Sequence, residues 1–332
     1  LWMEASISMA AGGSGADSGL STEGAALLEL KAGLEDPFGH LSDWQAPSGN
    51  TSTSTTLFPC AWTGVTCNTS ASVTGLDLSQ RNLSGTLSDA AFRALPWLVS
   101  FNASCNALSG ALPASLFSHV PGLVALDLSR NYFEAEFPPI SPASLSSLSF
   151  FSAYSNNFTG AIPAAFSELP RLRHLDLGGS FFQGPIPPQL GALSSLTYLG
   201  LSGNLLVGPI PPELGALSQL QHMVIGYNKF SSHIPPEFGN LTNLLYMDLC
   251  CTNLSGPIPP ELGRLGSLNT LFLYRNSLSG PIPPDLGQMS SLMSLDLSVN
   301  NLSGSVPPEF GGLRSLTLLS LMYNNLAGTL PQ

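Results

Sequence analysis

Leucines recur along this chain in a short alternating pattern of apolar and polar residues that breaks at a polar turn. Two clear copies are SSLTYLGLSGNLLVGPIPPELGAL, residues 194–217, and GSLNTLFLYRNSLSGPIPPDLGQM, residues 266–289. Alternation with a period of two predicts a short strand whose apolar side chains face inward. Each copy therefore predicts one strand, one polar turn and one returning segment that contains IPP.

The copies align on the residue that ends the LxxLxLxx pattern, which is asparagine in most of them. These residues are Arg81, Asn106, Asn131, Asn156, Ser180, Asn204, Asn228, Thr252, Asn276, Asn300 and Asn324. They mark eleven repeats, the first three steps of 25 residues and the rest of 24. Such a period predicts an α/β repeat fold, a right-handed leucine-rich repeat solenoid in which each unit buries its apolar face against its neighbours. We expect parallel strands, inward leucines, and asparagines that bond the backbone of the turn.

Three segments are expected along the chain: a leader or disordered stretch at 1–20, an N-terminal cap at 21–72, and the repeats at 73–332. From Thr22 to about Leu34 leucines stand at helical spacing behind a Thr N-cap, which predicts a helix covering the first repeat. Trp44 and Trp62 are expected to complete this cap, and residues 48–56 to form a Ser/Thr-rich loop. Cys60 and Cys67 predict a disulfide, since no histidine lies beside them at metal-ligand spacing.

Composition narrows the class of partner. The formal net charge is -11 and only ten residues are Lys or Arg, which argues against nucleic acid and against an anionic membrane surface. No apolar run approaches the roughly 18 to 20 residues that cross a bilayer. Neither a metal nor an organic cofactor is expected.

Eight Asn-x-Ser/Thr triplets favour a secreted, glycosylated protein, although the repeat consensus itself generates some of them. The triplets begin at Asn50, Asn68, Asn82, Asn102, Asn157, Asn240, Asn253 and Asn301. The last repeat shows no second cysteine pair and no polar cap. Because terminal repeats need capping, we expect the chain to be a fragment of a longer ectodomain.

The motifs PCAWTGVTC, LDLSQRNLSG and xIPPELG resemble the extracellular domains of plant leucine-rich repeat receptor kinases. Within that family, SAYSNNFTGAIP, LDLGGSFFQGPIP, LQHMVIGYNKF and LFLYRNSLSG resemble receptors for CLE-type peptide hormones such as tracheary element differentiation inhibitory factor. The resemblance implies a non-catalytic region outside the plasma membrane, reached by the secretory pathway, with a Ser/Thr kinase domain elsewhere in the protein. It also implies a CLE-type peptide of about 12 residues as ligand and a SERK-like co-receptor kinase as partner.

Residues at the variable strand positions are the candidates for ligand binding. Phe150, His174, Tyr198, His222 and Tyr246 form a ladder of rings, which either stabilises the sheet or contacts a ligand. Glycines after the strand suggest a floor that another backbone approaches closely. The full predicted set is Tyr154, Gly178, Gly179, Tyr198, Gly226, Tyr227, Asp248, Phe272, Tyr274 and Asp296. The resemblance supports most of these residues, whereas the alternative for each aspartate is that LDLS is simply the repeat consensus.

The length of the repeat array is consistent with a bound peptide of this size. Strands about 4.8 Å apart make repeats four to eleven span roughly 34 Å, enough for an extended peptide of about ten to twelve residues. Receptors for CLE-type peptides bind the peptide's C-terminal carboxylate through an Arg-x-Arg pair. The only such spacing here, Arg171 and Arg173, is predicted to be a solvated turn, and the true pair is expected beyond Gln332.

Three other functions are compatible with parts of the sequence. An enzyme is disfavoured, because the five histidines form no ligand motif and no nucleophile or phosphate-binding motif is present. A soluble inhibitor of a microbial cell-wall hydrolase would be expected to end in a second cysteine pair. An immune receptor for a microbial peptide would share the fold and differ in ligand. The states of Cys105, Cys250 and Cys251 stay open.

Overall fold

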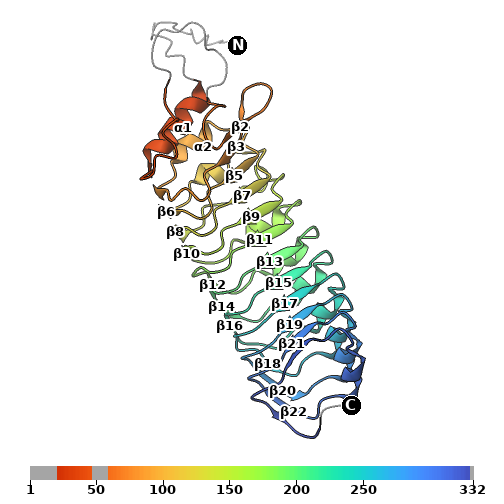
Figure 1. Ribbon diagram of the computed structural model, residues 1–332. Helices are drawn as coiled ribbons and strands as arrows, with labels where there is room; N and C mark the ends of the chain where they lie inside the picture. The colour runs from red at the N-terminus through yellow and green to blue at the C-terminus, as the bar shows by residue number, and fades with distance from the viewer. Residues whose placement is uncertain (1–20, 47–58, 330–332) are drawn as a thin grey trace, which may run out of the picture.

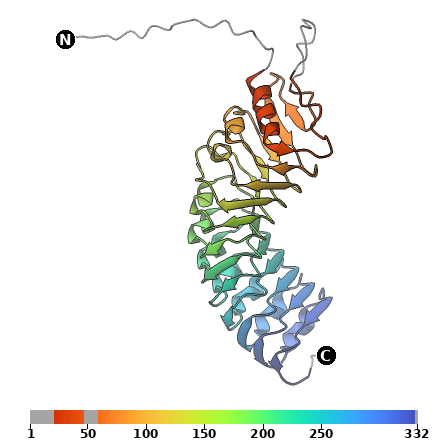
Figure 2. The same ribbon diagram turned by 90° about the vertical axis from the view of Figure 1, so that its left-hand side faces the viewer.

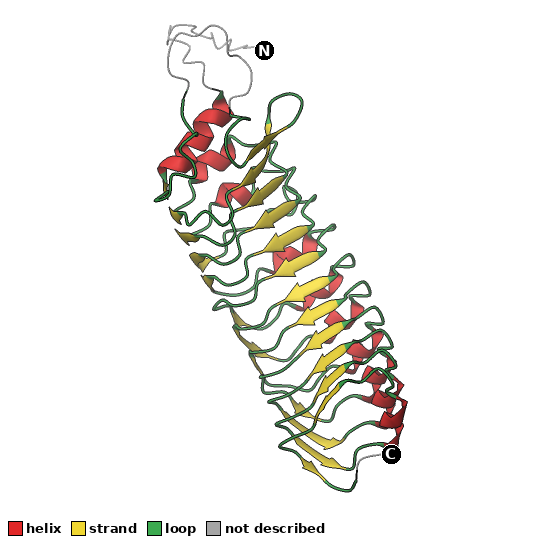
Figure 3. Ribbon diagram, in the orientation of Figure 1, coloured by secondary structure: helices red, strands yellow, loops and turns green. Residues whose placement is uncertain are grey.

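The computed structural model describes residues 21–46 and 59–329, which form one elongated, curved array (Figures 1 and 2). The predicted leader, the Ser/Thr-rich loop and the Asn50 triplet lie outside the described residues. Strands, loops and short helices repeat at regular intervals along the whole array (Figure 3). The predicted leucine-rich repeat solenoid is confirmed.

The main sheet takes one strand from each of the eleven repeats and one, β2, from the N-terminal cap. Its twelve strands follow chain order, with β2 antiparallel to β3 and the remaining pairs parallel. The strands are β2 (Val65–Cys67), β3 (Val73–Asp77), β5 (Ser100–Asn102), β7 (Ala125–Asp127), β9 (Phe150–Ser152), β11 (His174–Asp176), β13 (Tyr198–Gly200), β15 (His222–Val224), β17 (Tyr246–Asp248), β19 (Thr270–Phe272), β21 (Ser294–Asp296) and β23 (Leu318–Ser320). From β5 to β21 the central apolar residue of each strand is buried in the core, so its two neighbours face outward, as the alternation predicts, whereas Leu319 of β23 at the end of the array is 39% exposed.

The returning segments contain short 3-10 helices, most of which begin with the prolines of IPP. Proline fixes φ near the helical value and leaves no N–H unpaired at the first position of a helix. The 3-10 helices are η1 (Ala114–Phe117), η2 (Ala164–Glu168), η3 (Pro188–Ala192), η4 (Pro212–Ala216), η5 (Pro236–Asn240), η6 (Pro260–Arg264), η7 (Pro284–Gln288) and η8 (Pro308–Gly312). Because these segments are bulkier than strands, the array curves and leaves the main sheet on its inner, concave side (Figure 2).

Short strands on a second side of the array were not predicted. They form where the residues after the turn, often Leu-Ser-Gly, pair with the same residues of the next repeat. One group contains β1 (Leu34–Glu35), β4 (Ser84–Gly85), β6 (Ala107–Gly110), β8 (Tyr132–Glu136) and β10 (Asn157–Thr159). A second contains β12 (Gln183–Gly184), β14 (Leu205–Gly208) and β16 (Lys229–Phe230), and a third β18 (Ser255–Gly256), β20 (Ser277–Pro281), β22 (Asn301–Gly304) and β24 (Asn325–Leu326).

A ladder of buried asparagines joins the repeats, as predicted. Asn228 is representative: Nδ2 donates to the carbonyls of Leu201 and Ile225 at 2.9 and 3.0 Å. Its Oδ1 accepts from the Leu206 N–H at 3.0 Å. One side chain therefore bonds the backbone of two consecutive repeats.

The second-side sheet is interrupted where this ladder lacks asparagine. Its breaks fall between β10 and β12 and between β16 and β18, at the repeats that carry Ser180 and Thr252. The Ser180 hydroxyl is buried without a hydrogen-bond partner, and Thr252 Oγ1 bonds Asn276 rather than the preceding repeat. A hydroxyl on Cβ is too short to reach the N–H that an asparagine amide would reach. The regular strand pairing is therefore lost at these two repeats, although single backbone hydrogen bonds, such as Gln183 N–H to Gly160 O at 2.8 Å and Ser255 N–H to Ser232 O at 2.9 Å, still join them to the preceding repeat.

The N-terminal cap covers the first repeat with α1 (Thr22–Ala32), beside α2 (Asp89–Arg93). The predicted Thr N-cap was wrong by one residue: Ser21 is the N-cap, and its Oγ accepts from the Gly24 N–H at 3.0 Å. The predicted extension to Leu34 was also wrong. Gly33 ends the helix, and Leu34 pairs with Gly85 in the antiparallel β1–β4 ladder.

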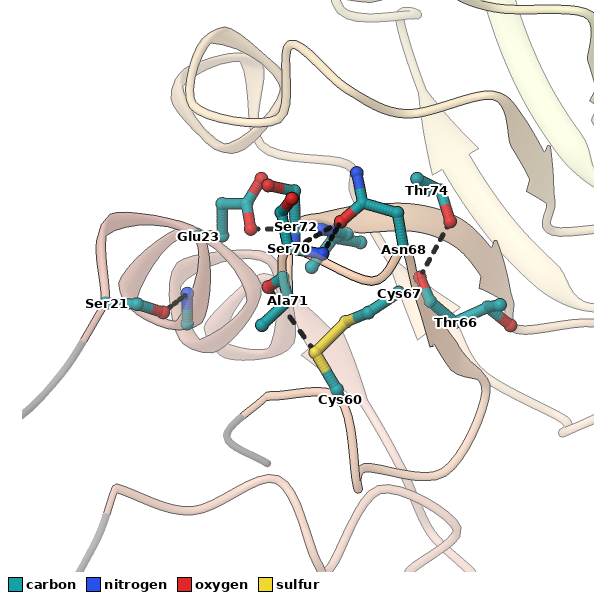
Figure 4. The surroundings of a disulfide bond; sticks show 12 residues. Ser21, Glu23, Cys60, Thr66, Cys67, Asn68, Ser70, Ala71, Ser72 and Thr74 are labelled. Atoms are coloured by element: carbon teal, nitrogen blue, oxygen red, sulfur yellow. Dashed lines mark hydrogen bonds between the residues drawn. A yellow bond between two sulfur atoms is a disulfide. The ribbon is translucent and has the colours of Figure 1, made fainter. Parts of the chain in front are cut away.

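The cap is held by rings, a disulfide and one carboxylate. The Trp44 and Trp62 rings stack with centroids 5.4 Å apart, and Cys60 is bonded to Cys67 (Figure 4). Glu23 on α1 accepts a hydrogen bond from the Val73 N–H at 3.0 Å, which ties the helix to the first strand of the repeats. Cys105, Cys250 and Cys251, left open from the sequence, are free thiols.

Candidate ligand-binding face

The aromatic ladder is a continuous stack across the concave face. Ring centroids are 4.4 Å apart for Phe150–His174 and 4.3 Å for His174–Tyr198, with nearly parallel planes. The stack continues through His222 and Tyr246 at 5.9 and 6.4 Å. These contacts fit the structural alternative, in which neighbouring rings stabilise the sheet.

The stack does not end at Tyr246. It passes diagonally to Phe272, with centroids 5.8 Å apart, and on to Tyr274 at 6.0 Å, both edge to face. The ladder was predicted from one strand position of the repeats, and that prediction did not include the continuation to Phe272 and Tyr274. The result is an aromatic surface from the fourth repeat to the ninth.

Burial favours the uncharged form of two titratable side chains on this face, His174 in the ladder and Asp176. Desolvation lowers the pKa of His174 to about 4, so its imidazole is neutral at pH 5 to 8. Desolvation likewise raises the pKa of Asp176 to about 6, against the lowering effect of hydrogen bonds from the Gly178 N–H and the Tyr198 hydroxyl. Below about pH 6 the face therefore carries less charge than its sequence indicates, whereas at pH 7 Asp176 is mostly ionised.

Replacing Asp176 by asparagine is expected to stabilise the protein at neutral pH. A raised carboxyl pKa means that the folded state favours the protonated form, so the contribution of Asp176 to stability is fully present below about pH 4 and is lost as the pH rises through about 6. Asn102 occupies the equivalent position and its Oδ1 makes the same turn bond, at 3.0 Å, that Asp176 makes to Gly178. We expect the variant to be more stable by about 1 to 2 kcal/mol at pH 7, after allowance for solvent screening, and equal to wild type at pH 4. Urea unfolding at both pH values measures this, and a gain of the same size at pH 4 would contradict the cause.

The glycines of the predicted floor differ in how tightly the next repeat packs against them. A Cβ on Gly226 would lie 2.8 Å from the Cys250 carbonyl oxygen, and one on Gly178 would lie 3.0 Å from that of Ser202. Packing against the next repeat therefore accounts for these two residues without a ligand. Gly179 and Gly203 are different, because their φ values of 64° and 66° are close to those adopted by other residue types at the same repeat position. The backbone alone does not demand glycine there.

The two aspartates of the predicted set each accept a hydrogen bond within their own turn. Oδ1 of Asp248 accepts from the Cys250 N–H at 2.9 Å, and Oδ1 of Asp296 accepts from the Ser298 N–H at 2.9 Å. Asp77 and Asp127 make the same bond outside the predicted site. The consensus reading of LDLS is thus physically justified, and any role in ligand binding falls to the second carboxylate oxygen.

Two tyrosines and two thiols form a connected cluster in the seventh to ninth repeats. The hydroxyls of Tyr227 and Tyr274 lie 3.1 Å apart, and each also hydrogen-bonds a thiol, Cys251 and Cys250 respectively. Burial raises the pKa of the Cys250 thiol, and the bond to that thiol is the largest cause of the raised pKa of Tyr274. Tyr227, Tyr274 and Cys250 are therefore uncharged, and the hydrogen bonds of the cluster orient all four side chains. The sequence did not predict this role for the cysteines.

The ten predicted residues follow one another along the array from Tyr154 to Asp296, and we call this line of residues the track. They differ in exposure. Tyr154 and Tyr227 are 39% and 52% exposed, and Gly179 is also exposed. The half-buried members are Tyr198, Phe272, Tyr274 and Asp296, and the buried members are Gly178, Gly226 and Asp248. The exposed residues are the ones that a ligand can reach without any rearrangement.

The described sequon asparagines lie mainly at the surface. Asn68, Asn82, Asn240, Asn253 and Asn301 are exposed. Asn102 and Asn157 are half-buried, and Asn102 lies on the concave face itself, in β5. Glycosylation at these asparagines stays a prediction.

Arg171 and Arg173 are both exposed, on the turn that leads into β11. Among the described residues, no cluster of three or more His, Cys, Asp and Glu side chains is placed to bind a metal ion. None of the helices in residues 21–46 and 59–329 has the length and hydropathy needed to span a membrane.

Models of known families match much of the chain. A leucine-rich repeat region model matches residues 144–301, a leucine-rich repeat N-terminal domain model matches 20–68, and a further repeat model matches 291–313. A crystal structure of a TDR receptor is 48% identical over 77% of this chain and 44% of that chain, with a TM-score of 0.75. The chain is a leucine-rich repeat domain of the plant receptor-kinase type.

Other plant receptor kinases are also similar to this chain. The receptor kinase HAESA of Arabidopsis, solved with the peptide hormone IDA and the co-receptor SERK1, is 31% identical over 92% of this chain and 54% of that chain, with a TM-score of 0.81. The receptor-like kinase SKM1 of Arabidopsis thaliana is 42% identical over 82 residues, which are 25% of this chain and 8% of the relative. This leucine-rich repeat domain thus spans about half of each solved ectodomain and matches a small part of the curated relative.

Proposed function

We propose that the chain is part of the extracellular domain of a plant receptor kinase and binds a short secreted CLE-type peptide, of about 12 residues, on its concave face. The described region supplies binding and no catalysis. Signalling then follows recruitment of a SERK-like co-receptor by the peptide-bound face, and the kinase domain lies elsewhere in the protein.

The observation that carries this proposal is the track itself. Exposed rings at Tyr154 and Tyr227 flank the exposed, side-chain-free backbone of Gly179 and Gly203. Aromatic rings supply apolar contact and hydroxyl donors, and bare backbone allows close approach of an extended chain. The predominance of aromatic rings on this face favours a peptide whose backbone and apolar residues make most of the contacts. The likeness to the TDR receptor at 48% identity supports the same class of ligand.

The test is a titration of the secreted ectodomain that contains this chain against a hydroxyproline-bearing CLE-type dodecapeptide by calorimetry. Asp248→Asn keeps the Oδ1 acceptor for the Cys250 N–H and removes only the negative charge. Tyr227→Ala removes an exposed ring from the surface. We expect each variant to bind roughly tenfold more weakly, equivalent to about 1.4 kcal/mol.

Two results would contradict the proposal. Absence of binding by the wild-type ectodomain would remove this class of ligand. Wild-type affinity in both variants would leave the peptide class intact but show that the track is not its site.

A further inference from the structure

A hollow of about 420 Å³ opens at the N-terminal end of the track and was not predicted from the sequence. It is lined by Asn106, Arg130, Asn131, Tyr132, Tyr154 and Ser155. These residues come from the turns after β5, β7 and β9, together with the start of β8. We name it the Arg130 hollow.

The polar groups that the Arg130 hollow offers to a ligand are few and well defined. The asparagine amides are occupied, since Asn106 and Asn131 bond the backbone of their own and neighbouring repeats. Tyr132 is 59% exposed, and the hydroxyls of Tyr132 and Tyr154 make no hydrogen bond within the described residues. The free groups are therefore one guanidinium and two phenol hydroxyls.

Arg130 is a cation without a partner. Its side chain is exposed and makes no hydrogen bond or ion pair in residues 21–46 and 59–329, where the single salt bridge joins Arg93 to Asp89. The backbone is fixed, because the Arg130 N–H donates to the Tyr154 carbonyl at 2.7 Å. Other arginines of the described residues also lack an ion pair, but Arg130 lines a hollow together with two tyrosine rings.

The hollow is continuous with the glycine floor. The Tyr154 ring lies between them: Cδ2 is 3.3 Å from the point where a Cβ would stand on Gly178, and Cε2 is 3.5 Å from the corresponding point on Gly179. One face of the ring therefore borders the glycines while the residue also lines the hollow. An extended chain that crosses Gly179 toward the N-terminal repeats passes Tyr154 and reaches Arg130.

We propose that the Arg130 hollow binds an acidic side chain near one end of the peptide, an inference that rests on the proposed function. A guanidinium fork matches a carboxylate with two parallel hydrogen bonds, and the phenol hydroxyls can donate further ones. The track beyond Tyr154 presents neutral rings and the carboxylates of Asp248 and Asp296, and the next exposed guanidinium at this repeat position, Arg275, lies at its opposite end. The hollow is therefore the favourable place for a negative charge at this end, and it sets a preference among peptides of one class.

The test uses the same secreted ectodomain and synthetic CLE-type dodecapeptides that carry glutamate or glutamine at either end. We expect wild type to bind one glutamate peptide about tenfold more tightly than its glutamine partner, with a preference that weakens as salt increases. Arg130→Gln should abolish this preference while binding the glutamine peptide as wild type does. Glutamine suits the backbone, because Gln80 occupies the same repeat position with the same φ of 55°.

Arg171→Gln is the matched control, since it removes an exposed positive charge from a turn outside the hollow. It should keep the full preference for glutamate. Equal binding of all the peptides by wild type, or a preference that survives in Arg130→Gln, would overturn the subsite alone. If wild type binds no peptide, both the proposed function and the subsite are wrong.

Discussion

Replacing Asn228 by alanine is expected to lower the free energy of unfolding by about 3 kcal/mol. The Asn228 side chain donates to the carbonyls of Leu201 and Ile225 and accepts from the Leu206 N–H, all within the buried core. Alanine leaves these backbone groups unpaired where water does not reach them. Each buried group left unsatisfied costs about 1 to 3 kcal/mol, so a single substitution weakens two repeats at once.

Urea unfolding followed by circular dichroism measures the loss, and hydrogen exchange at the Leu206 amide locates it. Repeat arrays can unfold in parts, so hydrogen exchange at the Leu206 amide is the decisive measurement. Ser180→Asn is the reciprocal variant: it should gain about 1 kcal/mol by pairing groups that the buried hydroxyl leaves unpaired. Unchanged exchange at Leu206 in the alanine variant would show that the ladder is not a source of stability.

The fold was predictable because the repeat period fixes which residues must be buried. Leucine at fixed places and asparagine at the turn are obligatory for the stack, so eleven copies of one pattern gave the main sheet and the ladder. The second-side strands were missed because their Leu-Ser-Gly segments are too short to show a period of their own. Their breaks at Ser180 and Thr252 depend on side-chain reach, which only coordinates reveal.

The candidate site was only partly predictable, because the repeat period does not fix the residues of the outward-facing positions. Positions that face outward could be found by alignment, but the use of each residue depends on its neighbours in the next repeat. Gly226 has a packing explanation, Cys250 supports Tyr274, and Asp248 first bonds its own turn. Unpaired groups such as the guanidinium of Arg130 can be recognised only when all contacts are visible.

Replacing Gly179 by tyrosine is expected to weaken peptide binding at least about 100-fold, or roughly 2.7 kcal/mol, with little loss of stability. Gly179 is exposed on the track, and a ring there would occupy the path of an extended chain. The backbone tolerates the change, because Tyr227 and Tyr323 hold the same repeat position with φ of 52° and 56°. A new Cβ would lie 3.3 Å from the Ser155 backbone, close enough to require a shift of a few tenths of an ångström.

Calorimetric titration with the CLE-type dodecapeptide and thermal unfolding of the same preparations separate the two effects. Gln80→Tyr is the matched control, since it places the same ring at the same position of the first repeat, outside the track, where φ is 55°. It should bind as wild type does. Because packing explains Gly178 and Gly226 more fully than Gly179, this variant tests the glycine whose place on the track the ligand hypothesis addresses. Full affinity in Gly179→Tyr would mean that the peptide lies elsewhere on the array.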